Sequence, residues 1–151
     1  MVWTVFVVAS VVVLGLAAGV FFAFSSFIMG GLGRASDGAA GDAMNGINEA
    51  APLPPFMCVF FGALLVPGVT GIWGLAGEHE GGGWVLAGAA VYLVGVFGVT
   101  AALNVPLNNR LLVASDKAAA WRTYRQPWTA WNHVRTFAGV VATVLAAVAL
   151  V

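Results

Sequence analysis

The sequence predicts an all-α integral membrane protein, a four-helix bundle with short amphipathic helices in its two cytoplasmic loops. Three observations support this prediction. Of 151 residues, 61% are hydrophobic and only 8% are charged, whereas a soluble domain has about a quarter charged residues. Polar gaps divide the chain into four apolar blocks, and a helix needs roughly 20 apolar residues to cross a bilayer core. All six basic residues lie in or beside the first and third gaps.

The four expected spans belong to a single domain, 1–151, and cover residues 2–33, 51–77, 83–109 and 129–151. The first block is longer than the apolar region of a signal peptide and lacks a basic segment before it, so it is interpreted as a span. The fourth block is interrupted by Arg135. It still reaches across the bilayer if this arginine lies near the inner surface.

The basic side chains predict the orientation in the cell membrane. Arg34 lies in the first gap and the other five lie in or beside the third, while residues 77–84 contain none. By the positive-inside rule, loops 1 and 3 are cytoplasmic and both termini are on the outer side. The formal net charge is zero, so nothing points to a nucleic-acid partner.

No metal site is predicted. A single cysteine, Cys58, excludes a cysteine cluster. His79 stands between Glu78 and Glu80 in a Gly-rich segment, and three adjacent side chains cannot all face one ion. These residues are expected to form a solvated loop.

Two further patterns describe the helices. Tryptophans prefer membrane interfaces, and they are expected at the outer helix ends (Trp3, Trp73 and Trp84) and at the inner ends (Trp121, Trp128 and Trp131). Small residues allow close helix contacts in lipid, and those expected at such contacts are Gly15 and Gly19, Gly88 and Gly95, and Ala142 and Ala146.

Polar side chains of the third span recur on one helix face. Thr100, Asn104 and Asn108 are spaced four residues apart, and Pro106 between the asparagines is expected to kink the helix and free the carbonyl of Ala102. Such a carbonyl needs a partner or a water-lined cavity at membrane depth. Alternatively, the asparagines only hold helices together.

Each cytoplasmic loop is expected to contain a short helix. In the first loop, residues 42–50 place Asn45, Asn48 and Glu49 on one face, which is either a solvated surface or turned inward toward the span asparagines. In the third loop, a helix over 115–125 is expected to end at Gln126 and Pro127.

The fourth span would then start anew, with Thr129 as its cap. His133 and Arg135 fall in its first turns, where free amide hydrogens favour an anion. An ion pair between Glu49 and Arg135 is expected, and snorkelling of Arg135 to lipid headgroups is the alternative.

These residues give the chain a resemblance to a known family. The stretches that carry it are GLAAGVFFAFSSFIMGGL, MNGINEA, YLVGVFGVTAALNVPLNNRL and PWTAWNHVRT. Together they resemble the anthrone-oxygenase-like family of small four-helix membrane proteins over nearly the whole chain. One departure is Gly30, where relatives often have a proline after the methionine that ends the first span.

The resemblance implies a membrane protein whose fungal relatives oxidise anthrones to anthraquinones without an organic cofactor. It carries the family's polar motif over to Asn48, Asn104, Pro106, Asn108, Trp131, Asn132, His133 and Arg135. An enzyme of this type needs a base and a positive group beside the developing oxyanion. The candidate base is Glu49 or His133, and Arg135 is the candidate positive group.

The remaining candidates would bind the substrate, and they are Asn48, Asn104, Asn108, Trp131 and Asn132. Phe21, Phe22, Phe24 and Phe27 are a possible apolar lining, although such residues more often pack or face lipid. The implied partners are membrane lipid, a hydrophobic aromatic molecule of the anthrone or hydroquinone type, and dioxygen.

The alternative is a noncatalytic membrane protein that binds a lipid or quinone, or an accessory subunit of a membrane complex. An arginine at a helix end suits a phosphate equally well. The sequence leaves open the natural substrate, the metal content and the oligomeric state.

Overall fold

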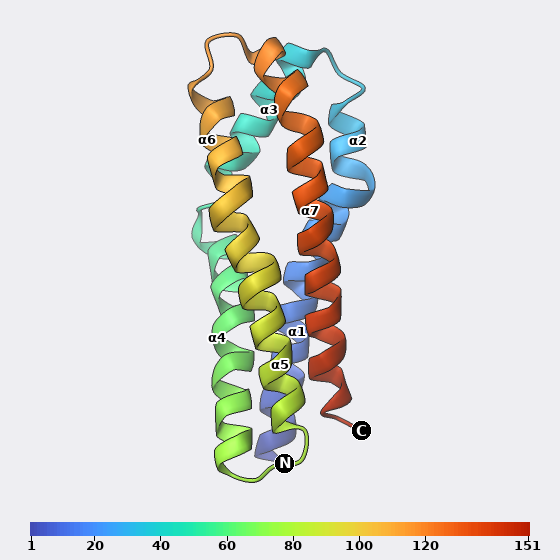
Figure 1. Ribbon diagram of the computed structural model, residues 1–151, viewed down its shortest axis with the longest axis vertical. Coiled ribbons are helices and arrows are strands. Elements are labelled where there is room, and N and C mark those ends of the chain that lie inside the picture. The colour runs from blue at the N-terminus through green and yellow to red at the C-terminus, as the bar shows by residue number, and fades with distance from the viewer.

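A computed structural model describes residues 1–151 and confirms the all-α class. Helices account for 87% of the residues and no strand is present. The segments are α1 (Val2–Ala23), η1 (Phe24–Ile28), α2 (Met29–Leu32), α3 (Asp37–Ala50), α4 (Pro54–Ala76), α5 (Gly82–Tyr92), η2 (Leu93–Gly98), η3 (Thr100–Asn104), α6 (Val105–Val113) and α7 (Lys117–Val148), where η marks a wider π-helical turn. Because α1 continues into α2 and α5 into α6, the segments form five continuous helices, which run along one long axis except for the short α3 (Figure 1).

Three of these helices are long and apolar enough to cross a membrane. They cover Val2–Leu32, Pro54–Ala76 and Gly82–Val113, and they correspond to the first three expected spans. The fourth expected span lies in α7, which is not among them. Asn132, His133 and Arg135 reduce the hydropathy of that helix, so a fourth crossing stays a prediction.

The expected break at Pro127 is wrong, because α7 runs through this proline without interruption. Trp121 and Tyr124 before the proline and Trp128 after it are all buried in one apolar cluster with residues of α3 and α6, and this packing holds the helix together. The hydroxyl of Thr129 donates to the carbonyl of Arg125 at 2.6 Å instead of capping a new helix.

The amino end of α7 lies instead at Asp116, whose carboxylate accepts a hydrogen bond from the amide of Ala119 at 2.9 Å. His133 and Arg135 are therefore more than four helical turns from any free amide hydrogens. The first-loop helix α3 also starts earlier than expected, at Asp37.

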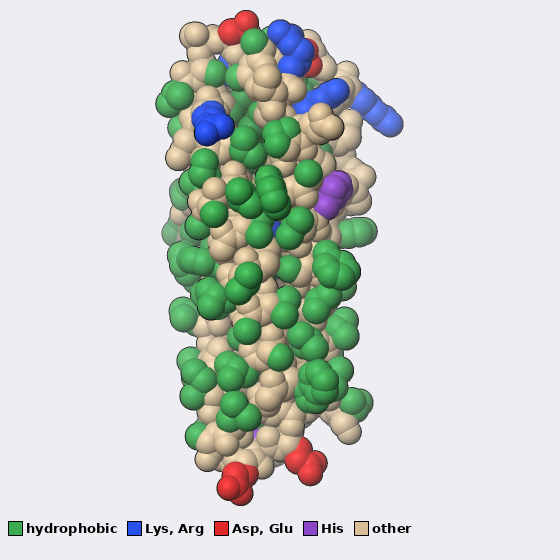
Figure 2. Space-filling model, viewed as in Figure 1, with side chains coloured by type: hydrophobic (Ala, Val, Ile, Leu, Met, Phe, Trp, Pro, Cys, Tyr) green, Lys and Arg blue, Asp and Glu red, His purple; other side chains and the backbone are tan.

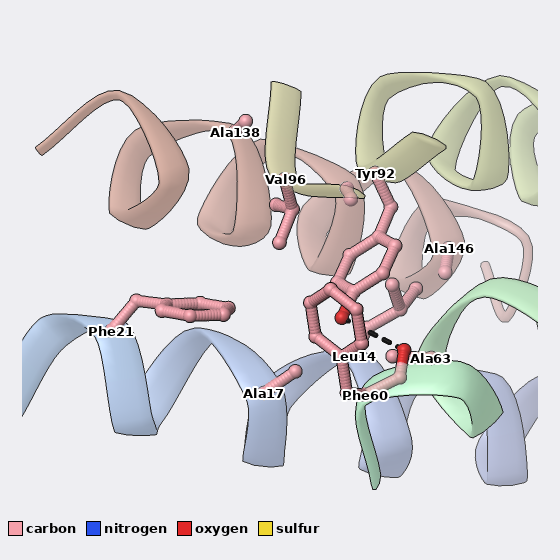
Figure 3. Packing of buried hydrophobic residues seen from close by; sticks show 10 residues of the cluster. Leu14, Ala17, Phe21, Phe60, Ala63, Tyr92, Val96, Ala138 and Ala146 are labelled. Carbon is pink, nitrogen blue, oxygen red and sulfur yellow. Dashed lines mark hydrogen bonds between the residues drawn. The ribbon is translucent and has the colours of Figure 1, made fainter. Parts of the chain in front are cut away.

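The main apolar core lies between α1, α4, α5 and α7 (Figure 3). Tyr92 is fully buried there and its hydroxyl donates to the carbonyl of Phe60 at 3.0 Å. Gly88 and Ala142, both expected at helix contacts, do lie at one: a Cβ on Gly88 would be 2.8 Å from the carbonyl oxygen of Ala142 in α7. Gly19, by contrast, has nothing within 4 Å of such an atom, so it makes no close helix contact.

The aromatic side chains only partly follow the interfacial prediction. Trp121 and Trp128 are buried in the second cluster and are core residues. At the other end of the molecule, His79 stacks on Trp3 with ring centroids 4.9 Å apart and meets Trp73 edge-on at 5.3 Å. The histidine of the exposed loop therefore packs against a tryptophan pair.

The two ends of the molecule differ in charge. Both termini lie at the end formed by the connection between α4 and α5, and α3 lies at the opposite end, where α7 begins (Figure 1). Lys and Arg side chains gather at the α3 end beside some acidic ones, whereas the end with the termini shows acidic side chains and no Lys or Arg (Figure 2). Below, "the basic end" means the end formed by α3, Arg110 and residues 117–125.

Candidate functional site

A cavity of about 660 Å³ opens between α1, α3, α4, α6 and α7, and 13 of its 20 lining residues are hydrophobic. This volume lies in the range of sites for small molecules, roughly 300 to 1,000 Å³. The cavity adjoins both apolar clusters, because residues of each cluster line it. It therefore lies between the main core and the basic end.

Aromatic rings form much of the lining. Phe21 and Phe24 line the cavity as the sequence suggested, whereas Phe22 and Phe27 are exposed on the outside of the molecule. Sequence reasoning missed two rings of α4, Phe56 and Phe60. Their four-residue spacing just after the prolines could have indicated one inward face.

Arg135 is the charged group that projects into the interior beside this cavity. Its side chain is only 5% exposed, and its guanidinium carbon lies 4.6 Å from the centroid of the Phe21 ring and 5.0 Å from that of Trp128. Nη2 donates to Asn132 Oδ1 at 2.8 Å and Nη1 to Thr100 Oγ1 at 3.3 Å, while Nε has no partner. A buried cation without a counterion is costly.

The expected ion pair between Glu49 and Arg135 is wrong. The structure contains one salt bridge, between Arg122 and Asp37 on the surface. Glu49 lies in the last turn of α3, is exposed, and lines the same cavity as Arg135. It therefore remains in contact with solvent at the rim, while the guanidinium is held in the interior by its stacking and hydrogen bonds. The snorkelling alternative is also wrong, because the guanidinium is buried.

Asn132 holds the guanidinium in place. Besides accepting from Arg135, it donates through Nδ2 to the carbonyl of Phe21 and to Ser25 Oγ, both at 2.8 Å. Ser25 lies in the π-helical turn η1 and is also 2.8 Å from Thr136 Oγ1. Single π-turns inside α-helices are frequent at functional sites, and this one brings α1 into contact with the polar residues of α7.

The polar face of the third span points toward α7. Thr100 meets Arg135, and Asn104, which is buried, donates to the carbonyl of Trp128 at 3.2 Å. Asn108 accepts from Trp128 Nε1 at 2.8 Å and from the Tyr124 hydroxyl at 2.9 Å. Asn104 thus acts as a helix–helix contact, and only Thr100 and Asn108 of the three line the cavity.

The second π-helical turn beside the cavity explains how the chain accommodates Pro106. Thr100–Asn104 forms η3, directly before the proline. Pro106 cannot donate to the carbonyl of Ala102, and the wider turn changes the hydrogen-bond spacing at this point. The face of Thr100 and Asn108 is thereby kept toward the cavity.

Two more polar groups at the basic end complete the lining. Asn48 lines the cavity and its Nδ2 is buried without a partner. Burial raises the pKa of the neighbouring Tyr124 hydroxyl, so this group stays protonated and remains a donor to Asn108. Together with Arg135, Asn48 gives the cavity unused hydrogen-bond donors.

Of the candidate site residues, Asn48, Glu49, Asn108 and Arg135 line the cavity, whereas Asn104, Trp131, Asn132 and His133 do not. His133 and Trp131 are exposed on α7 and line no part of this cavity. The buried positions of α7, including Trp128, Asn132 and Arg135, define one helix face, and His133 projects away from it by the helical period. Glu49 is thus the one carboxylate or imidazole in the lining. No three His, Cys, Asp or Glu side chains come together as metal ligands would.

Comparison with known proteins gives a family. The family model described as anthrone oxygenase matches residues 56–145, which is more than half of the chain and includes α4 through most of α7. No curated protein and no solved structure matches the sequence.

Proposed function

The chain belongs to the anthrone oxygenase family, because the family model matches more than half of the chain. We propose that the protein oxidises an aromatic carbon acid with dioxygen, and that the substrate binds in the cavity. The observation that supports this most directly is Arg135. A buried guanidinium with an unused Nε, stacked between two aromatic rings and without an acidic partner, is suited to a ligand that becomes negatively charged.

The proposed reaction needs three events. A base removes a proton from the ring CH₂ of an anthrone, and the electron pair delocalises onto the carbonyl oxygen as a phenolate. The carbanion form transfers electrons to dioxygen and a carbon–oxygen bond forms, giving a hydroperoxide after protonation. Loss of water from the hydroperoxide leaves the second carbonyl of an anthraquinone. Dioxygen is the oxidant, and one oxygen atom leaves as water.

The residues take distinct roles in this proposal. Arg135 stabilises the phenolate oxygen, and Asn132 and Thr100 orient the guanidinium. Glu49 accepts the proton, because it is the carboxylate in the lining and lies at the rim, where it can exchange protons with solvent. Asn48 offers a buried amide donor to a second oxygen, one carried as a substituent on the aromatic ring system.

We also propose a multi-pass, four-helix arrangement in the cell membrane, with α7 as the fourth span. The three apolar helices support a membrane location. Basic side chains at the α3 end support a cytoplasmic position for loops 1 and 3, and both termini lie at the opposite end (Figures 1 and 2). The substrate would then reach the cavity from the inner leaflet.

One observation favours the alternative of a protein that binds a quinone or lipid without oxidising it. Because His133 does not line the cavity, Glu49 is the single candidate base in the lining, and it is exposed to solvent at the rim. An apolar cavity with one arginine would also hold a preformed anion or a quinone carbonyl. An oxygenase would consume oxygen when the substrate is added, and a protein that only binds the ligand would not.

Oxygen uptake by the purified full-length chain tests the proposal. A panel of anthrones and hydroquinones is supplied in neutral detergent, with metal content measured on the same sample. Glu49→Gln should lower the rate about 10²-fold or more, as expected for loss of a general base. Asp42→Asn is the matched control, because Asp42 is an exposed acid of the same helix that does not line the cavity.

The outcomes separate the alternatives. Uptake that depends on Glu49 and not on Asp42 supports the oxygenase. Substrate binding without oxygen uptake supports the noncatalytic protein. Wild-type rates in Glu49→Gln would eliminate the proposed base.

A further inference from the structure

A second hollow lies on the outer face of α7, away from the cavity. Its volume is about 700 Å³, and it is formed where α2 approaches the part of α7 around Pro127. The side chains that give it its character are Arg122, Arg125, Gln126, Thr129 and His133. Arg122, Arg125, Thr129 and His133 are three to four positions apart and therefore form a stripe along one side of the helix, with Gln126 beside it. We call this hollow the α2–α7 groove.

The groove is basic and contains no acid. Neither aspartate nor glutamate lines it. Arg122 is compensated by Asp37 at 3.1 Å, but Arg125 forms no salt bridge. Its guanidinium reaches across to the opposite wall, because a Cβ on Gly33 would lie 3.6 Å from Nη1. One exposed, uncompensated arginine therefore bridges the two walls.

A glycine leaves part of the α2 wall open. The α2 residues that line the groove are Met29 and Gly30, and a Cβ on Gly30 would meet no atom within 4 Å, so space is left beside this glycine. A bulky polar group can therefore approach Arg125 and His133 without displacing anything. The departure of Gly30 from the family's usual proline falls in this wall.

The same side of α7 becomes apolar beyond His133. Phe137, one turn further along, is 74% exposed, and Val140 continues the stripe. Phe27 of η1, the turn that leads directly into α2, is 65% exposed. The surface thus has a basic, hydrogen-bonding part at the basic end and an apolar part directly next to it, along the helix axis.

We propose that the α2–α7 groove binds a phospholipid with an anionic headgroup. The phosphate would be held by the planar donors of Arg125 and by the side chains of Gln126 and His133. Its acyl chains would lie along Phe137 and Phe27. A soluble phosphate ester shares the headgroup chemistry, but it would leave these exposed aromatic rings uncovered. The lipid is therefore the source that accounts for both parts of the surface, and this binding does not depend on the proposed oxidation.

Native mass spectrometry of the full-length protein in neutral detergent tests the proposal. The probes are phosphatidylglycerol and phosphatidylcholine with the same acyl chains, and glycerol phosphate as the soluble headgroup. Phosphatidylglycerol should bind in preference to phosphatidylcholine. Arg125→Gln should weaken that binding about fivefold, the effect of one basic side chain at an anionic membrane surface.

Two variants complete the test. Arg110→Gln is the matched control, because Arg110 is an exposed arginine of the basic end outside the groove, and it should keep wild-type binding. Phe137→Ala should weaken binding of the lipid and leave binding of glycerol phosphate unchanged. Since Arg125 and Phe137 are exposed, neither substitution removes a core contact.

Three results would overturn the proposal. Equal binding of the two lipids would show that the headgroup charge is not recognised. An Arg110→Gln effect as large as that of Arg125→Gln would show that general charge, and not the groove, attracts the lipid. Displacement of phosphatidylglycerol by glycerol phosphate at equal concentration would make the site a soluble phosphate site.

Discussion

Replacing Arg135 by methionine should separate stability from function. The substitution removes a charge that is buried without a counterion and keeps a long apolar side chain between Phe21 and Trp128. If Arg135 is retained for ligand chemistry, the folded state should tolerate its loss while activity does not. If Arg135 instead serves the fold, its replacement should lower the free energy of unfolding substantially.

The change in the free energy of unfolding follows from a few contacts. The lost hydrogen bond to Asn132 involves a charged donor and is worth roughly 1.5 to 3 kcal/mol. Two cation–π contacts contribute about 2 kcal/mol each, because the guanidinium is desolvated. Against these losses stands the desolvation of the guanidinium, several kcal/mol for a buried ion. We therefore expect the free energy of unfolding of Arg135→Met to stay within about 2 kcal/mol of the wild type.

The effect on turnover should be much larger. Removing one donor to a developing oxyanion costs about 10²- to 10³-fold in kcat. Arg135→Lys should fall between methionine and wild type, because it keeps the charge but loses the planar fork that reaches both Asn132 and Thr100. Arg110→Gln is the control for loss of an arginine elsewhere.

Denaturant titration in detergent micelles measures the stability, and oxygen uptake with an anthrone measures the turnover. Destabilisation of Arg135→Met by more than about 4 kcal/mol, the cost of breaking a needed buried charge pair, would make the residue structural. Full turnover in the same variant would refute its role at the oxyanion.

Two further predictions concern packing and topology. Gly88→Ala should destabilise the fold by about 1 to 3 kcal/mol, because the new Cβ would lie 2.8 Å from a backbone oxygen of α7. Gly19→Ala is the control, because its Cβ would meet open space and should not destabilise the fold. Thermal unfolding of the two variants checks this prediction. In a Cys58→Ala background, Glu80→Cys should react with an impermeant external thiol reagent and Lys117→Cys should not. Labelling of position 117 but not of position 80 would mean that the orientation is reversed.

The sequence predicted those parts of the fold that depend on local composition. Apolar length alone located the three membrane-length helices. The four-residue spacing placed Thr100 and Asn108 on one face, and both line the cavity. The close approach of Gly88 to α7 also follows from a local rule about small residues.

What the sequence could not predict depends on packing between distant segments. A proline is a strong helix breaker in isolation, yet Pro127 is held within α7 because Trp121, Tyr124 and Trp128 are buried together on both sides of it. The position of His133 outside the cavity has the same cause. Because α7 is continuous, the helical period determines which of its positions face the protein interior, and His133 faces outward.

The same continuity bears on whether α7 crosses the membrane. Hydropathy counts Asn132 and Arg135 as if both faced lipid, but Asn132 is fully buried and Arg135 is 5% exposed, and their hydrogen bonds go to α1, α7 and η3. Polar groups that face the protein interior and form hydrogen bonds there do not incur the full cost of groups exposed to hydrocarbon. Below them, α7 presents Phe137 and a run of alanines and valines.

The positions of the termini point in the same direction. Both ends of the chain lie at the same end of the molecule (Figure 1), and three helices are apolar enough to cross. An odd number of crossings would place the termini on opposite sides of the bilayer. If the first three helices span it along the common axis, α7 must span it as well. A thiol at position 117 and one at position 151 should therefore be accessible from opposite sides, and equal accessibility from one side would exclude the fourth crossing.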